Sequence, residues 1–167
     1  MPGYEPSYYV ASRNPSPLRP SLAGRITTDV AVVGGGFAGL AAALELAERG
    51  YRVALVEAKR VGWGASGRNG GQMLNGLNPS VGTIEKLAGA EAARAIWDMT
   101  VEATDIVRER IRRHAIACDW QPGYVHAATK PSHAAAMAED VAMMADRYGY
   151  RNLTYFDRAA LADHVVS

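Results

Sequence analysis

The clearest hydrophobic pattern in the chain lies between residues 29 and 57. Apolar, β-branched residues at 30–33 predict a buried strand, and the alanine-rich segment from Ala38 to Arg49 predicts a helix. The run at 52–56 predicts a second strand, which follows Gly50, a residue type suited to the left-handed position after a helix. Strand, glycine-rich turn, helix and strand in this order predict a β-α-β unit of an α/β fold.

Helical periodicity returns further along the chain. It predicts helices at 81–89, 90–114, 132–148 and 158–163. Asp157 is a residue type that caps helix N-termini, so we expect it to begin the last of them. Short apolar stretches predict strands at 115–119, 124–129 and 153–156, the first two separated by a Pro-Gly turn.

The first 24 residues have a different character, because they contain prolines at positions 2, 6, 15, 17 and 20. Prolines at this density disfavour a regular helix or a central strand. We therefore expect an irregular arm over the domain surface, with its tyrosines, Tyr4, Tyr8 and Tyr9, packed against the domain.

The turn after the first strand carries glycines at the spacing of a dinucleotide-binding loop. Gly34 allows a sharp turn, Gly36 lets the backbone approach a pyrophosphate, and Gly39 lets the helix sit close to the sheet. The new helix then directs its free N–H groups at the phosphates. Because such glycines also serve purely structural ends, the surrounding sequence decides between the two interpretations.

That context favours a nucleotide. Glu57 ends the second strand about 20 residues beyond the turn, where an acid accepts hydrogen bonds from ribose hydroxyls. An acid here disfavours the 2′-phosphate of NADP and leaves FAD or NAD, although Arg60 is close enough in sequence to accept a phosphate.

A second glycine-rich stretch covers residues 62–72, with Ser66, Arg68, Asn69 and Gln72 among its glycines. It has no hydrophobic period, so it is a loop whose backbone can approach a ligand closely. The Arg68 guanidinium could offer a forked donor set to a phosphate or carboxylate. The alternative is a flexible surface linker, which this mixture of Trp, Arg and Asn disfavours.

Composition narrows the function classes. The formal net charge is +1, which provides no global field for nucleic acid or an anionic membrane. The single cysteine, Cys118, excludes an internal disulfide and a cysteine-based zinc cluster, and it fits a cytoplasmic setting. We expect no metal site. The apolar run at 30–44 is shorter than the roughly 18 residues that a membrane span needs.

The two glycine-rich segments, 33–40 and 62–72, with Glu57 between them, resemble the FAD-dependent amine and amino-acid oxidases of the D-amino-acid oxidase superfamily. Within it the resemblance is greatest to the gamma-glutamylputrescine oxidoreductases. It extends through Tyr8-Tyr9, the helix at 97–113 and the stretch at 123–126, so it covers nearly the whole chain.

This resemblance implies a Rossmann-type FAD-binding β-α-β unit with long helices and the start of a mixed-sheet substrate domain. The first loop would hold the FAD pyrophosphate, Glu57 the adenosine ribose, and the second loop would lie along the pyrophosphate and ribityl chain. The residues expected to contact FAD are Gly34, Gly36, Phe37, Ala38, Gly39, Glu57, Ala58, Ser66, Arg68, Asn69, Gly70, Gly71 and Gln72.

The resemblance also implies how FAD is held. Some members of the superfamily attach FAD covalently through a His or Cys, but residues 58–72 contain neither, so we expect non-covalent binding. His126 lies alone in a predicted strand, where a histidine is more often packed or exposed than catalytic. We therefore assign no catalytic residue.

By the same resemblance, residues 1–24 form an N-terminal arm, 25–115 the N-terminal part of the FAD-binding domain, and 116–167 the beginning of a substrate domain. Members of that superfamily are more than twice as long. We therefore expect later strands and most of the substrate pocket to follow Ser167, and residues 1–167 alone to be inactive.

The activity implied is oxidation of a C–N bond in a small-molecule amine by hydride transfer to flavin, with oxygen as the acceptor. One alternative is a non-catalytic module that binds FAD or NAD. The other is an NAD-dependent dehydrogenase, in which the second glycine-rich loop would have no role.

Overall fold

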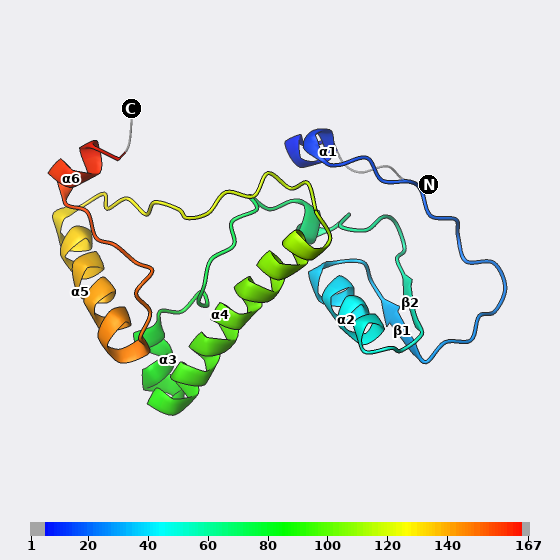
Figure 1. The fold of residues 1–167 in the computed structure, drawn as a ribbon, viewed down its shortest axis with the longest axis horizontal. Coiled ribbons are helices and arrows are strands. Elements are labelled where there is room, and N and C mark those ends of the chain that lie inside the picture. The colour runs from blue at the N-terminus through cyan, green and yellow to red at the C-terminus, as the bar shows by residue number, and fades with distance from the viewer. Residues whose placement is uncertain (1–5, 165–167) are drawn as a thin grey trace. The chain divides into compact units, whose positions relative to one another are not determined.

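The computed structural model describes residues 6–164. In chain order its elements are α1 (Tyr8–Ser12), β1 (Val30–Val33), α2 (Phe37–Glu48), β2 (Val53–Val56), the 3-10 turn η1 (Ala65–Gly67), α3 (Val81–Ala88), α4 (Ala90–Arg113), α5 (Pro131–Tyr148) and α6 (Arg158–Ala162) (Figure 1). They form two compact units. Of the described residues, the first contains 6–74 together with Arg110–Cys118, and the second contains Asn75–Glu109 and 119–164.

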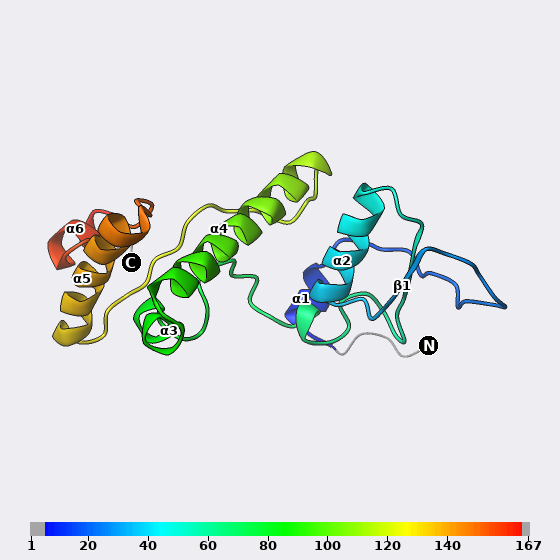
Figure 2. The ribbon, with the colours of Figure 1, turned by 90° about the horizontal axis from the view of Figure 1, so that it is seen from below.

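The first unit contains the predicted β-α-β arrangement. β1 and β2 pair in parallel, in a register that runs from Val30 opposite Val53 to Val33 opposite Val56. α2 packs beside both strands, as two views of the ribbon show (Figures 1 and 2). Gly50 has a φ of +89°, which is the left-handed conformation expected after the helix. The predicted strand, helix and strand are therefore confirmed to within a residue or two at each end.

This unit buries few apolar side chains among the described residues. Val33 is 86% exposed at the end of β1. On α2, Leu44 is half-buried, whereas Leu40 and Ala47 are exposed. The physical reason is area: two short strands cover only part of one helix face, and sheets of two strands are marginal by themselves.

The C-terminal turn of α4 is joined to α2 by ion pairs. Arg110 Nη2 lies 3.1 Å from Glu45 Oε2 and 3.6 Å from Glu48 Oε2, and Arg113 Nη1 lies 3.0 Å from Glu48 Oε1. The Arg110 side chain is only 17% exposed. The basic residues at the end of α4 therefore partner the acidic residues of α2, in addition to complementing the helix dipole.

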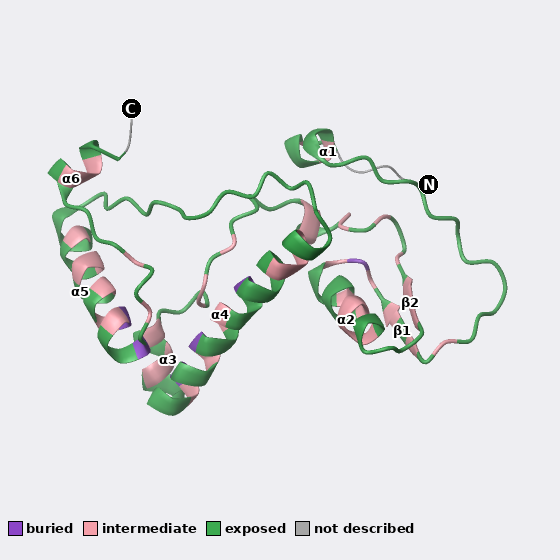
Figure 3. Ribbon diagram, in the orientation of Figure 1, coloured by how far each residue is buried: buried purple, intermediate pink, exposed green. Residues whose placement is uncertain are grey.

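The second unit is built from α3, α4 and α5 around an aromatic cluster. Trp97 of α4 packs edge-to-face against Tyr148 and Tyr150, with ring centroids 6.0 and 5.1 Å apart. Met144 of α5 completes the buried group. Figure 3 shows buried positions, in purple, on α4 and toward the C-terminal end of α5. Edge-to-face rings and a flexible methionine fill an irregular space well, so Met144 serves as a core residue.

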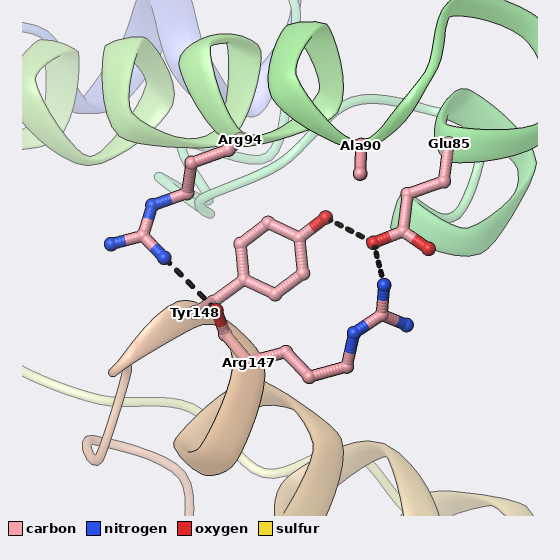
Figure 4. A pocket seen from close by; sticks show the side chains of 5 residues that line it. All are labelled: Glu85, Ala90, Arg94, Arg147 and Tyr148. Carbon is pink, nitrogen blue, oxygen red and sulfur yellow. Dashed lines mark hydrogen bonds and ion pairs between the residues drawn. The ribbon is translucent and has the colours of Figure 1, made fainter.

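A polar junction fixes the C-terminal end of α5. The Tyr148 hydroxyl and Arg147 Nη2 both donate to Glu85 Oε1 at 2.7 Å, while Arg94 Nη1 donates to the Arg147 carbonyl at 3.0 Å (Figure 4). These side chains line a cavity of about 100 Å³. These three hydrogen bonds link α3, α4 and the C-terminal end of α5, so the junction stabilises the helix packing.

The N-terminal arm departs from its prediction. α1 forms between Pro6 and Pro15, with the Ser7 hydroxyl accepting a hydrogen bond from the Val10 N–H. The spacing between these prolines is enough for one capped turn. Tyr8 and Tyr9 are 78% and 41% exposed, so the prediction that they pack on the domain was wrong, and Tyr4 lies outside the described residues.

The predicted strands at 115–119, 124–129 and 153–156 were also wrong, because none of these segments is extended within a sheet. Strand pairing among the described residues is confined to β1 and β2. An apolar, β-branched run becomes a strand only where a neighbour accepts its backbone hydrogen bonds. Asp157, by contrast, caps α6 as predicted, accepting from the Ala160 N–H at 2.8 Å.

Within residues 6–164, the helices are all too short or too polar to cross a membrane. The same residues bring together no group of three His, Cys, Asp or Glu side chains that could hold a metal ion.

The α3–α5 junction makes stability depend on pH. The Tyr148 hydroxyl, and then Arg147, lower the pKa of Glu85 below its ordinary value of 4.5. The carboxylate therefore stabilises the fold above that value, and the contribution is lost as the pH falls through the lowered pKa. We expect Glu85→Gln to be less stable than the wild type at pH 7, and the difference to be smaller at pH 3, which lies below the ordinary value.

Urea denaturation at both pH values measures this difference. Glu102→Gln, an exposed position on α4, is the control and should follow the wild type throughout. A Glu85→Gln deficit of equal size at both pH values would contradict the assignment.

Candidate dinucleotide-binding site

The glycine turn is shaped by a close approach between two backbone segments. Gly34 has a φ of +104°, and its N–H donates to the Val56 carbonyl at 2.8 Å, which continues the β1–β2 pairing into the turn. A Cβ at Gly39 would lie 2.0 Å from the Gly34 carbonyl oxygen. The first turn of α2 therefore reaches the end of β1 only because residue 39 has no side chain, as the sequence predicts.

The N-terminus of α2 supplies the donors of the candidate site. Gly36 is the N-cap residue, and helix geometry leaves the N–H groups of Ala38 and Gly39 without an intrahelical acceptor. The Phe37 N–H donates to the Ser66 hydroxyl at 3.0 Å. Ser66 comes from the second glycine-rich loop, so this bond brings together two segments that are 29 positions apart.

Glu57 braces the turn from the tip of β2. Its Oε2 accepts from the Gly35 N–H at 2.7 Å, and its Oε1 accepts from the Lys59 N–H at 2.9 Å. The Gly35 bond, followed by the Lys59 bond, lowers the pKa of Glu57, which keeps it ionised at neutral pH. A carboxylate has more acceptor sites than its backbone donors here use, so a half-buried Glu57 can still accept a ribose hydroxyl.

The second glycine-rich loop is folded against the first. The Gly62 N–H donates to the Gly35 carbonyl at 2.9 Å, and η1 then places Ser66 at the start of α2. A Cβ at Gly67 would lie 2.2 Å from the Gly62 carbonyl oxygen, so the loop closes tightly on itself. These contacts contradict the alternative of a flexible linker.

Arg68 and Asn69, two of the residues predicted to contact FAD, direct their side chains into the second glycine-rich loop. Arg68 donates from Nε and Nη2 to the Trp63 carbonyl, at 3.0 and 2.8 Å. Asn69 donates from Nδ2 to the carbonyls of Ala65 and Ser66, and its Oδ1 accepts from the Gly71 N–H at 2.9 Å. Both side chains thus hold the loop together.

The structure brings Gly34, Gly36, Phe37, Gly39, Glu57 and Ser66 into one continuous site, with Ala38 in the same helical turn. It leaves Ala58, Gly70, Gly71 and Gln72 exposed beside that site. Sequence analysis did not single out three residues whose backbone groups bind Glu57 or Arg68, namely Gly35, Lys59 and Trp63. A Trp five positions before an Arg was the one available signal, since these side chains stack readily.

This donor set fits a dinucleotide. A pyrophosphate needs N–H donors beside a backbone without side chains, and Gly36, Ala38 and Gly39 offer that combination at a helix N-terminus. A ribose needs an ionised acceptor at the neighbouring strand tip, and Glu57 is one.

Comparison with known proteins agrees with this geometry. Residues 29–166 match the family model of the FAD-dependent oxidoreductases, known as DAO. The chain belongs to this family. An NAD-dependent dehydrogenase is accordingly not supported. The DAO family implies an FAD-binding, Rossmann-like α/β fold, and the parallel β1–β2 pair with α2 is consistent with it.

Individual relatives are longer than this chain. It is 42% identical, over all 167 residues, to gamma-glutamylputrescine oxidoreductase of Escherichia coli, and covers 39% of that protein. It is 40% identical over 161 residues to the probable oxidoreductase OrdL of Haemophilus influenzae, covering 37% of it, and 39% identical over 157 residues to OrdL of Rhizobium meliloti, covering 36%. The chain thus spans about two fifths of the length of these relatives. No solved structure matches it.

The close approach of Gly39 to the Gly34 carbonyl can be tested by replacing Gly39 with alanine, which adds one methyl group. We expect Gly39→Ala to lower the free energy of unfolding by about 2 kcal/mol or more, because the new Cβ cannot coexist with the Gly34 carbonyl. Gly82→Ala in α3 is the matched control. Open space surrounds Gly82, so the same methyl group should stabilise that helix by about 0.5–1 kcal/mol. Equal effects of the two variants in urea denaturation would rule out the close approach.

Proposed function

We propose that this chain forms the FAD-binding, N-terminal part of a flavin-dependent oxidoreductase that oxidises a C–N bond of a small-molecule amine or amino acid. The observation that carries the proposal is the joined site, in which the second glycine-rich loop supplies Ser66 to the N-terminus of α2. Membership of the FAD-dependent family supports the cofactor. The name of the Escherichia coli relative, an oxidoreductase of a substituted amine, supports the substrate class.

In this proposal the residues of the chain bind and orient. The N–H groups of Ala38 and Gly39 hold the pyrophosphate beside Gly36, and Glu57 accepts the ribose hydroxyls while it keeps the turn in place through Gly35. When bound, FAD supplies the hydride acceptor for the amine carbon, and oxygen is the proposed final acceptor.

Binding is proposed to be non-covalent, since residues 58–72 carry no His or Cys. The side chains of Glu57 and Arg68 are engaged with backbone groups. We therefore assign their role to positioning and leave proton transfer unassigned.

The proposed site predicts that FAD binding requires a glycine at position 36. We expect the full-length protein to retain yellow flavin when it is purified. We expect Gly36→Val in that protein to weaken FAD binding by roughly tenfold or more. A valine side chain would occupy the pyrophosphate's place, and a Cβ at this position already lies 3.0 Å from the Ser66 hydroxyl. Flavin absorbance after desalting measures retention, with Gly82→Ala as the control.

A second variant separates the two effects of this valine. If it acts only by displacing the hydroxyl, Gly36→Val with Ser66→Ala would restore FAD binding, and the pyrophosphate placement would be wrong. Normal flavin content in Gly36→Val alone would also reject the placement.

The amine class can be tested without relying on oxygen. We expect anaerobic addition of small primary or secondary amines to bleach the bound flavin, and a matched panel of 2-hydroxy acids to leave it oxidised. Oxygen uptake with the same amines then tests the acceptor. Tightly bound flavin that no amine reduces would favour the competing function, a non-catalytic FAD-binding module.

A further inference from the structure

The Arg68 side chain is committed to its own loop. Its Nε and Nη2 lie on one edge of the guanidinium, and both donate to the Trp63 carbonyl, at 3.0 and 2.8 Å. The guanidinium carbon also stands 4.5 Å from the centre of the Trp63 ring. Of the two edges through which a guanidinium can clasp a phosphate by two parallel hydrogen bonds, the Nε–Nη2 edge is therefore occupied by a backbone oxygen.

This contact closes a short ring of chain from Trp63 to Arg68. Inside the ring, the Gly67 N–H donates to the Gly64 carbonyl at 3.2 Å and the Arg68 N–H donates to the Ala65 carbonyl at 3.1 Å. Ser66 lies in the middle of the closed segment. Its position is therefore fixed from both sides, by the turn before it and by the Arg68 side chain after it.

The closed segment and Gly62, the residue directly before it, touch the glycine turn at two points. The Gly62 N–H donates to the Gly35 carbonyl at 2.9 Å, and the Ser66 hydroxyl accepts the Phe37 N–H at 3.0 Å. If the segment opened, both bonds at the α2 N-terminus would loosen together. The side chain that keeps it closed controls that geometry at a distance.

We propose that Arg68 is a positioning residue that acts through the Trp63 carbonyl to hold Ser66 on the N-terminus of α2, and that it is not a phosphate ligand. The inference deepens the function proposed above and depends on it only for the identity of the bound molecule. The contacts themselves need no ligand.

The contact with the Trp63 carbonyl requires two coplanar N–H donors and not merely a positive charge. Arg presents two coplanar N–H donors and stacks on an aromatic face, whereas a Lys ammonium is a single point charge on a flexible stem. Lys59 already places such a charge over the same ring, with Nζ 3.2 Å from its centre. A lysine at position 68 would keep the positive charge and lose the double hydrogen bond.

Amide hydrogen exchange of the ligand-free protein tests the proposal at Gly62 and Phe37. We expect both Arg68→Gln and Arg68→Lys to speed exchange of these two amides by roughly three- to tenfold, the effect of losing one ordinary hydrogen bond from local opening. The Gly34 amide, bonded to Val56 within the sheet, is the internal reference and should keep its rate. Arg49→Gln, at the C-cap of α2, is the control for loss of a positive charge.

Unchanged exchange at Gly62 and Phe37 in Arg68→Gln would overturn the proposal. Normal exchange in Arg68→Lys would overturn it too, because charge alone would then suffice. Trp63→Phe retains the backbone carbonyl, so it should raise the exchange rates of Gly62 and Phe37 less than Arg68→Gln does. A larger effect of Trp63→Phe would show that the Trp63 ring, and not its carbonyl, holds Arg68.

FAD binding supplies a second and separate readout. We expect both Arg68 variants to weaken binding while its dependence on ionic strength stays that of the wild type, since no phosphate charge pair is lost. Retained affinity in Arg68→Lys with a flatter salt dependence in Arg68→Gln would instead identify a phosphate ligand. A wild-type protein that binds no flavin would refute the proposed function, and the exchange result would still decide the role of Arg68.

Discussion

The first unit depends on one backbone contact, the approach of Gly39 to the Gly34 carbonyl. Because residue 39 has no side chain, the first turn of α2 lies against the end of β1, and the N–H groups of Ala38 and Gly39 have no intrahelical acceptor. Everything else at the site is attached to that starting point. Glu57 reaches the turn from β2, and Ser66 reaches the first helical residue from the second loop.

The site is thus assembled from groups that satisfy one another. Glu57 takes the Gly35 N–H, Gly35 returns its carbonyl to Gly62, and Ser66 takes the Phe37 N–H. A chain of such bonds prepares the cradle before any ligand arrives, which reduces the ordering cost of binding. Membership of the FAD-dependent oxidoreductase family is consistent with a preformed cradle of this kind.

Local patterns predicted the local structure well and the long-range structure poorly. The β-α-β unit and the helices at 81–89, 90–114 and 132–148 follow from periodicity and glycine punctuation, which act within a few residues. The segments at 115–119 and 124–129 have strand-like composition and lack a partner among the described residues, a fact that no local window contains. The inward direction of Arg68 was hidden for a similar reason, since its acceptor is a backbone carbonyl and not a neighbouring side-chain type.

The exposure of Val33 has a practical consequence for handling the protein. A two-stranded parallel sheet has two outer edges, and neither β1 nor β2 has a further neighbour among residues 6–164. Open edges beside an exposed valine act as templates for strand addition by another molecule. A net charge of +1 supplies little mutual repulsion to oppose it. Concentrated solutions of residues 1–167 therefore favour self-association, and added charge at the sheet edge is the remedy that this geometry indicates.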